Sequence, residues 1–495
     1  MNKKRFITDV SLTFSTQIFV ALLGIFLLKL LAIYLSEDVM GIYMVIRRVA
    51  GFGFPLVTLN LGMSLARYIN IQKNKSEEYF YYSIVSTIII TLIVYILFYI
   101  FRDFFSKIFF GDVKYRLLLT PMILFLYASC FQALCQGYFR GKQKFVLMNL
   151  VNVLFWFVAL VVLYIPFNSK ASHTFLIKYF WIYALFSIGI NILLIIFQNQ
   201  NKVNLLHILR NKIRCKFNSS DREFFRYGIS RLPSGFLLAG IFSLPVIIAS
   251  SSMSLKIAAY IGIIVSVVRL VQIFMQPFNL LFLPKFAAYS VAGNRKLIRK
   301  NTQMVLEYAF SVPLVFGVLV AFLAQEIILL WFGEKYAIVI EYFSYLSPTI
   351  GFLFAFILLR GILDGLYTYP YANIITLIGL VTECILIWLS LMLKWNLLGL
   401  TISLGAAISV LGICTIVIIT IKEDLQLINK RTVFCFIWYF CILLCSYIFN
   451  QRVTFDNLYI SFLIKVAITI FILSFSLLLY YRLNFAWINY FLKKN

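Results

Sequence analysis

Long hydrophobic runs follow one another along nearly the whole chain. A membrane-spanning helix needs about 20 consecutive, mostly apolar residues, and the sequence contains about fourteen such runs. Their approximate limits are 10–35, 40–66, 79–101, 116–137, 144–167, 175–198, 226–250, 255–283, 303–331, 336–359, 371–394, 397–421, 432–450 and 457–481. Polar connections between them are short, so a soluble catalytic domain has no place. The pattern predicts an all-α polytopic membrane protein with about 14 transmembrane helices, and not an enzyme.

Composition agrees with this pattern. The chain is 62% hydrophobic and only 13% charged, whereas a soluble domain carries about a quarter charged residues. The bilayer must therefore act as the solvent. The net charge of +26 would suggest nucleic acid in a soluble protein, but here the positive-inside bias accounts for it, and no nucleic-acid partner is expected.

Charged residues in the connections give the orientation. The first predicted external loop, 36–38, has no Lys or Arg, and the N-terminal Lys3, Lys4 and Arg5 then lie inside. The other predicted cytoplasmic cations are Lys73, Lys75, Arg140, Lys142, Lys144, Lys202, Arg210, Lys212, Arg214, Lys216, Arg222, Arg226, Arg295, Lys296, Arg299, Lys300, Lys422, Lys430, Arg431, Lys493 and Lys494. With an even number of spans, both termini are cytoplasmic.

An internal repeat divides the chain. Gly137-Tyr138-Phe139-Arg140-Gly141 ends the fourth span and Gly361-Ile362-Leu363-Asp364-Gly365 ends the tenth, at an offset of 224 residues. The arginines of spans 2 and 8, Arg48 and Arg269, recur at an offset of 221. Chance similarity between hydrophobic segments is the alternative. Duplication predicts two six-helix lobes, 1–215 and 216–430, followed by two additional helices in 431–495, with a substrate site between the lobes as in transporters built from parallel repeats.

Arginines inside the predicted spans are the strongest candidates for a binding site. An ionisable residue at membrane depth is costly and tends to face a cavity or a partner. Arg47 and Arg48 lie in span 2 and Arg269 lies near the middle of span 8. Arg47 and Arg48 point about 100° apart on a helix, and Arg48 is the one that aligns with Arg269. A guanidinium binds two phosphate oxygens at once, so these residues predict an anionic substrate unless they only reach the interface or bond to loop carbonyls.

Other ionisable residues in the spans have competing interpretations. Lys29 in span 1 is a weaker candidate for substrate binding, because its stem, like that of Lys465 in span 14, can reach the interface. Glu383 in span 11 is a candidate for proton or sodium coupling, or for neutralising a buried arginine. Glu307, near the cytoplasmic end of span 9, is a second candidate for coupling, although an interfacial salt bridge is its default interpretation.

The ends of spans 4 and 10 hold candidate gate residues. These are Arg140, Arg360 and Asp364. Arg360 and Asp364 are four residues apart on a helix, so a local ion pair is the simpler interpretation. The glycine pairs flanking these positions, such as Gly137 and Gly141, usually indicate close helix packing.

The remaining candidates point to structure. Eight Cys show no disulfide framework, neither His has partners at metal-ligand spacing, and buried apolar thiols are the interpretation we adopt. Trp331 and Trp395 fall at predicted external interfaces, where aromatic residues anchor a protein. No cofactor or metal is expected.

Taken together, the order of these motifs resembles one transporter family. It is similar to the Wzx-like polysaccharide flippases, for O-antigen or capsule repeat units, of the multidrug/oligosaccharidyl-lipid/polysaccharide exporter superfamily. The similarity covers essentially the whole chain. The matching segments are Lys3-Lys4-Arg5 with the first span, Met40-Gly41-Ile42-Tyr43, the run Gly137 to Lys144, Trp331-Phe332-Gly333 and the run Arg360 to Gly365.

The resemblance implies a function. Such proteins have two lobes around a cavity that opens alternately to each side, and the substrate is an undecaprenyl-pyrophosphate-linked glycan in the bacterial cytoplasmic membrane. The matching pyrophosphate-binding residues would be Arg48, together with Arg47, and Arg269. Membrane lipids and other polysaccharide assembly proteins, a polymerase and a chain-length regulator, are the implied partners.

Three alternatives stay open at this stage. A peptidoglycan-precursor flippase shares the same chemistry, and a multidrug exporter shares the fold but favours cavity carboxylates for cationic drugs. A membrane glycosyltransferase or polymerase is weakly suggested by Glu37 and Asp38 in the first external loop. Such enzymes usually carry a large external loop, and the sequence has none.

Overall fold

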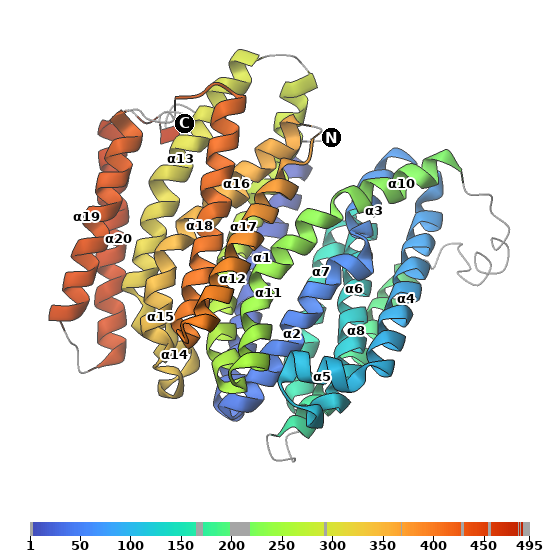
Figure 1. Cartoon of the computed structure of the whole chain (residues 1–495). Coiled ribbons are helices and arrows are strands. Elements are labelled where there is room, and N and C mark those ends of the chain that lie inside the picture. The colour runs from blue at the N-terminus through green and yellow to red at the C-terminus, as the bar shows by residue number, and fades with distance from the viewer. Residues whose placement is uncertain are drawn as a thin grey trace. The chain divides into compact units, whose positions relative to one another are not determined.

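The computed structural model is built from helices and short turns. It describes residues 3–164, 172–198, 218–291, 295–367, 369–426, 430–453, 457–483, 485 and 487–488, and no strand occurs among them. Within these residues, thirteen helices are long and apolar enough to cross a membrane. The eighth predicted span, 255–283, falls in the 37-residue helix α12. The predicted all-α polytopic fold is confirmed (Figure 1).

The chain divides into two compact units, Met1–Ala259 and Tyr260–Asn495. The first contains α1 (Lys3–Tyr34), α2 (Glu37–Thr58), α3 (Leu61–Ile71), α4 (Ser76–Ile100), α5 (Arg102–Phe110), the 3-10 turn η2 (Val113–Leu118), α6 (Leu119–Gly141), α7 (Phe145–Tyr164), α8 (His173–Gln198), α10 (Ser219–Ser230), α11 (Leu232–Ser252) and the start of α12 (Leu255–Val291). Helix α6 is central, because α2, α3, α4, α7 and α8 all pack against it. Figure 1 shows α4, α6 and α8 side by side.

The second predicted span, 40–66, is interrupted where it was expected to be continuous. Leu59 and Asn60, between α2 and α3, both have left-handed backbone angles, with φ of 48° and 52°. Asparagine tolerates this conformation better than most residues. The Thr58 hydroxyl accepts a hydrogen bond from the Asn60 backbone N–H at 3.3 Å, which satisfies a group that the interruption would otherwise leave without a partner. Helix α12, the predicted counterpart of this segment in the second lobe, carries no such interruption.

A second interruption matches the first. The predicted span 226–250 is divided at Arg231 into α10 and α11, and α11 packs along α2 while α10 packs on α3. The Asn60 side-chain amide donates to the Arg231 carbonyl at 2.9 Å. The two breaks therefore lie against each other, and the Asn60 side chain at the first satisfies a backbone carbonyl at the second.

Close packing of α3 on α6 depends on glycine. A Cβ at Gly137 would lie inside van der Waals contact with the backbone of Gly62, and one at Gly141 would lie 2.7 Å from the Leu65 carbonyl oxygen. The close-packing interpretation of this glycine pair is therefore confirmed. The lysine that follows, Lys142, forms an ion pair with Glu77 of α4.

This packing predicts opposite effects for two glycine-to-alanine changes. Gly137→Ala should lower the free energy of unfolding by about 1–3 kcal/mol, because the backbone it meets cannot move aside as a side chain can. Gly189→Ala, in α8, has open space around its Cβ and should be neutral or stabilising by up to about 1 kcal/mol. Denaturant unfolding in detergent measures both. Equal effects of the two changes would refute the packing argument.

The second unit contains the rest of α12 and the later helices. These are α13 (Arg295–Phe322), α14 (Ala324–Phe332), α15 (Val339–Leu346), α16 (Ile350–Leu366), α17 (Tyr371–Met392), α18 (Asn396–Lys422), α19 (Lys430–Arg452) and α20 (Leu458–Arg482). The predicted span 336–359 forms α15 and α16, joined by a 3-10 turn around Pro348. Helices α16 and α17 both pack on α18.

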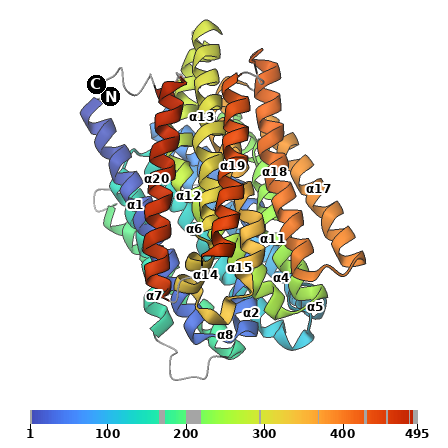
Figure 2. The same ribbon diagram turned by 90° about the vertical axis from the view of Figure 1, so that its left-hand side faces the viewer.

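The last two helices are bonded to α13 and α14. Figure 2 shows α13, α19 and α20 side by side. Arg431 of α19 pairs with Glu307 of α13 at 3.0 Å, and Lys465 of α20 pairs with Glu326 of α14 at 2.7 Å. The Tyr480 hydroxyl of α20 also donates to the Ser311 carbonyl of α13 at 3.2 Å.

The predicted boundaries at residues 215 and 430 stay a prediction. Packing places α10 and α11 in the first unit, because they follow α3 and α2. It places α19 and α20 in the second unit, because of their bonds to α13 and α14.

Three sequence-based expectations are wrong in part. Lys465 does not reach an interface, since its side chain is 3% exposed and paired with Glu326. Trp331 is buried against Phe332 and is no interfacial anchor, whereas Trp395 is exposed as expected. Among the described cysteines, Cys130, Cys135 and Cys435 are buried, but Cys384, Cys441 and Cys445 are exposed on apolar helices. A thiol is apolar enough to be stable against lipid, so hydrophobicity alone did not distinguish cysteines buried between helices from cysteines exposed on the helix surface.

Candidate substrate-binding site

Arg47 lies among aromatic rings in the first unit. It is the eleventh residue of α2, so it lies about 15 Å along the helix axis from Glu37, about half of a bilayer core. Its guanidinium carbon is 5.0 Å from the centre of the Trp156 ring of α7 and 5.7 Å from that of Tyr43, and Nη1 donates to the Tyr43 hydroxyl at 3.3 Å. No carboxylate pairs with Arg47 among the described residues. The positive charge is therefore held by ring faces and a hydroxyl.

The tyrosines behind this arginine form a buried layer. Tyr43 and Tyr179 are 6.4 Å apart between ring centres, and Tyr179 and Tyr183 are 5.8 Å apart. All three are at most 5% exposed, whereas Arg47 and Trp156 are partly exposed. The two partly exposed residues of the cluster are thus Arg47 and Trp156. This pair suits an anionic group attached to a ring or a chain.

Arg48 is more buried than its neighbour. The residue is 6% exposed, and its backbone carbonyl accepts a hydrogen bond from the Ser243 hydroxyl of α11 at 3.0 Å. Arg269 of α12 is exposed in the second unit, and Lys29 is exposed on α1. The predicted pairing of Arg48 with Arg269 across the repeat stays a prediction.

Glu383 is enclosed within the second unit. It is 0% exposed, and neither carboxyl oxygen has a hydrogen-bond partner in the described part of the chain. Helix α17 packs on α18, whose one charged residue is the terminal Lys422, and on α16, whose charged residues Arg360 and Asp364 pair with each other at 3.4 Å. An ionised carboxylate without a counter-ion is very costly in such surroundings.

The other predicted residues have local partners or lie at helix ends. The ion pair predicted between Arg360 and Asp364 is confirmed, and Arg360 also lies 5.7 Å from the Phe356 ring centre. Arg140 is exposed at the end of α6. Glu307, a candidate for ion coupling, is buried and paired with Arg431. Gate and coupling roles of these residues stay predictions.

Sequence reasoning missed two features of the site. Tyr43 is four residues before Arg47, so the shared helix face was a signal that could have been used. Trp156 is more than a hundred residues away, and only the packed fold brings it to Arg47. No group of His, Cys, Asp and Glu that could hold a metal ion occurs among the described residues.

Comparisons with known proteins identify the fold. No protein-family model matches the sequence, and no curated protein matches it. Among solved structures, the lipid II flippase MurJ in an inward closed conformation has a TM-score of 0.69 at 15% identity, over 95% of this chain and 98% of that one. An inward-facing multidrug resistance MATE family transporter of the MOP superfamily has a TM-score of 0.67 at 12% identity, over 84% and 98%. A MOP superfamily transporter from Pyrococcus furiosus has a TM-score of 0.54 at 13% identity, over 84% and 94%.

At these identities the similarity shows the fold. The chain is a multi-pass membrane protein whose fold is that of MurJ and of the MATE family transporters. These neighbours are transporters rather than enzymes.

Proposed function

We infer that this protein is a flippase for undecaprenyl-pyrophosphate-linked oligosaccharide repeat units, of O-antigen, capsule or another exopolysaccharide. It moves them from the cytoplasmic to the outer leaflet by alternating access. The observation that carries this proposal is the partly exposed residue Arg47 at mid-span, whose guanidinium lies beside Trp156 and has no carboxylate partner among the described residues.

The physical argument concerns the cost of charge at that depth. An arginine in the middle of a span faces water or a partner, because hydrocarbon would cost several kcal/mol. A diphosphate carries the opposite charge, and its transfer into the membrane is costly for the same reason. Bringing the two together offsets part of both costs, and a guanidinium binds two phosphate oxygens at once. Arg48, Arg269 and Lys29 are the further residues proposed to bind the diphosphate.

Fold similarity alone supports a flippase and a multidrug exporter equally. An arginine without a carboxylate favours an anionic substrate over a cationic drug. The lipid II flippase is matched over 95% of this chain, and the multidrug transporter over 84%. Because a peptidoglycan precursor is also anionic, a peptidoglycan-precursor flippase is the second candidate function.

We further propose that the chain lies in the bacterial cytoplasmic membrane with both termini in the cytoplasm. The supporting observation is the distribution of Lys and Arg among the connections. A polymerase and a chain-length regulator would act on the flipped units.

Two experiments test the function. In a strain lacking the gene, lipid-linked glycan should accumulate on the cytoplasmic leaflet. In proteoliposomes, the purified protein should make lipid-linked glycan accessible to a sugar-binding probe added outside. Complementation of strains that lack either an oligosaccharide flippase or the lipid II flippase separates the two candidates. The proposal is wrong if the protein rescues only the second strain, or if leaflet distribution is unchanged by deletion.

Glu383 gives a separate prediction about coupling. Glu383→Gln mimics the neutral carboxyl in shape, so the protein should fold normally while transport loses its response to an imposed pH gradient. Glu341→Gln is the matched control, since Glu341 of α15 is exposed and accepts a hydrogen bond from the Tyr345 hydroxyl. Transport in proteoliposomes with and without a gradient measures both variants. If Glu383→Gln follows the gradient as the unchanged protein does, Glu383 carries no coupling proton.

A further inference from the structure

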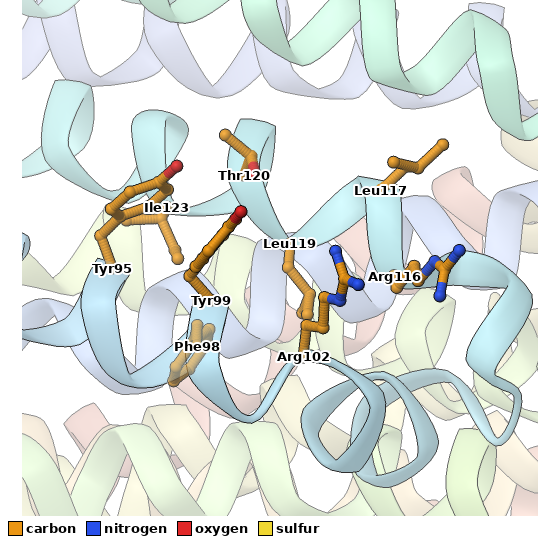
Figure 3. Close-up of a pocket in the computed structure, with 9 residues that line it drawn as sticks. All are labelled: Tyr95, Phe98, Tyr99, Arg102, Arg116, Leu117, Leu119, Thr120 and Ile123. Atoms are coloured by element: carbon orange, nitrogen blue, oxygen red, sulfur yellow. The ribbon is translucent and has the colours of Figure 1, made fainter.

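A pocket with two arginines lies where α4 ends. Tyr95, Phe98 and Tyr99 of α4 line one side, and Arg102 of α5, Arg116 of η2 and Thr120 of α6 line the rest. In Figure 3, Arg102 lies between the rings of Tyr95, Phe98 and Tyr99 on one side and Arg116 on the other. This pocket is separate from the Arg47 cluster and does not depend on the proposed transport function.

The positive charge in the pocket is only partly neutralised. Arg116 lies 3.7 Å from Asp103, and both side chains are about half exposed, so this pair is weak. Arg102 has no ion-pair partner among the described residues, and it too is exposed. The pocket is lined by two guanidiniums and by no carboxylate, which leaves a net positive charge for an anion.

An apolar track leads to this charge along α4. Ile88, Leu92, Ile96 and Tyr99 recur at helical spacing, and each is 38–61% exposed. Helix α4 is a spanning helix whose most apolar window is only 11% buried, so this face meets the lipid. Its apolar run ends at Phe101, directly before Arg102. The charge therefore lies at the depth where phospholipid head groups begin.

We propose that the pocket binds one anionic phospholipid, such as phosphatidylglycerol. Its phosphate lies between Arg102 and Arg116, and its acyl chains follow Leu92, Ile96 and Tyr99. A planar guanidinium matches phosphate geometry, and tyrosine rings suit the boundary between acyl chain and head group. In the predicted orientation this lipid belongs to the outer leaflet.

Lipid retention tests the proposal. Protein released from nanodiscs of mixed phosphatidylglycerol and phosphatidylcholine is analysed by native mass spectrometry. The unchanged protein should retain phosphatidylglycerol preferentially, and the double variant R102Q/R116Q should retain one molecule fewer, with affinity reduced about 10- to 100-fold. The matched control is K107Q/K114Q, which removes the same charge from the same segment outside the pocket and should change retention less than about twofold.

Three outcomes would overturn the proposal. They are equal retention of both lipids by the unchanged protein, equal losses in the two double variants, and displacement of the lipid by excess inorganic phosphate, which would indicate a general phosphate site. The single variant R102Q supplies a second measurement, because Arg102 can be changed without disturbing the pair of Arg116 with Asp103.

Discussion

Replacing Arg47 with glutamine is expected to lower the rate of lipid-linked glycan flipping by about 10- to 100-fold, the equivalent of one lost charge-assisted interaction of 1.5–3 kcal/mol. The variant keeps a polar side chain of similar length, but the cation between Trp156 and Tyr43 is gone. A diphosphate that enters the membrane to mid-span then has no cation at this position to offset its charge. The measurement is the initial rate of flipping in proteoliposomes.

A second arginine provides the control for this experiment. Arg67 of α3 is also stacked on a tyrosine, at 4.5 Å from the Tyr227 ring centre, and it lies in the same unit but near the end of its span. Arg67→Gln should retain the rate within about twofold, as expected for an exposed interfacial cation. Arg47→Lys should give an intermediate rate, because it keeps the charge and loses the planar fork. An unchanged rate in Arg47→Gln would exclude Arg47 from substrate binding.

Replacing Lys465 with methionine is expected to reduce the free energy of unfolding by about 3–5 kcal/mol. Glu326 is 0% exposed, and it would lose its cation while keeping only the Ser461 hydroxyl, which donates to Oε1 at 2.6 Å. The double change Lys465→Met with Glu326→Leu should recover most of the loss, because both charges are then removed from the interior. Unfolding in detergent by heat or denaturant measures the difference.

The partly exposed pair of Lys256 with Glu37 is the matched control. Its N–O distance is also 2.7 Å, but the lysine side chain is 51% exposed. Lys256→Met should therefore cost no more than about 1 kcal/mol. Equal effects at the two pairs, or a double variant as unstable as Lys465→Met alone, would show that burial of the charges does not set the cost.

The sequence predicted the helical membrane fold well, because a hydrophobic run of span length has few other interpretations. It did not predict where spans break. The interruption at Leu59 and Asn60 depends on a hydrogen bond to Arg231, 171 residues away along the chain. No local pattern carries that information.

The candidate site was predicted in type and only partly in position. Arginines at membrane depth are conspicuous because they are costly, so Arg47 and Arg48 were both found. Which of them is more accessible depends on how α2 is rotated against α7 and α11, and the structure leaves Arg47 partly exposed while burying Arg48. The prediction for Lys465 was wrong for a related reason. A flexible stem can reach water or a buried carboxylate, and only the docking of α20 on α14 decides between them.

The bonding of α19 and α20 to the preceding helices limits how the chain could be shortened. A protein ending at residue 429 would keep the buried Glu307 and Glu326 but lose Arg431 and Lys465, the cations of these two ion pairs, and a carboxylate at membrane depth is costly. A twelve-span version of this protein would thus need neutral replacements at positions 307 and 326 in the same step. Deleting only the last two helices is expected to destabilise the helices that remain. Loss of activity in such a deletion would therefore not by itself assign a transport role to α19 and α20.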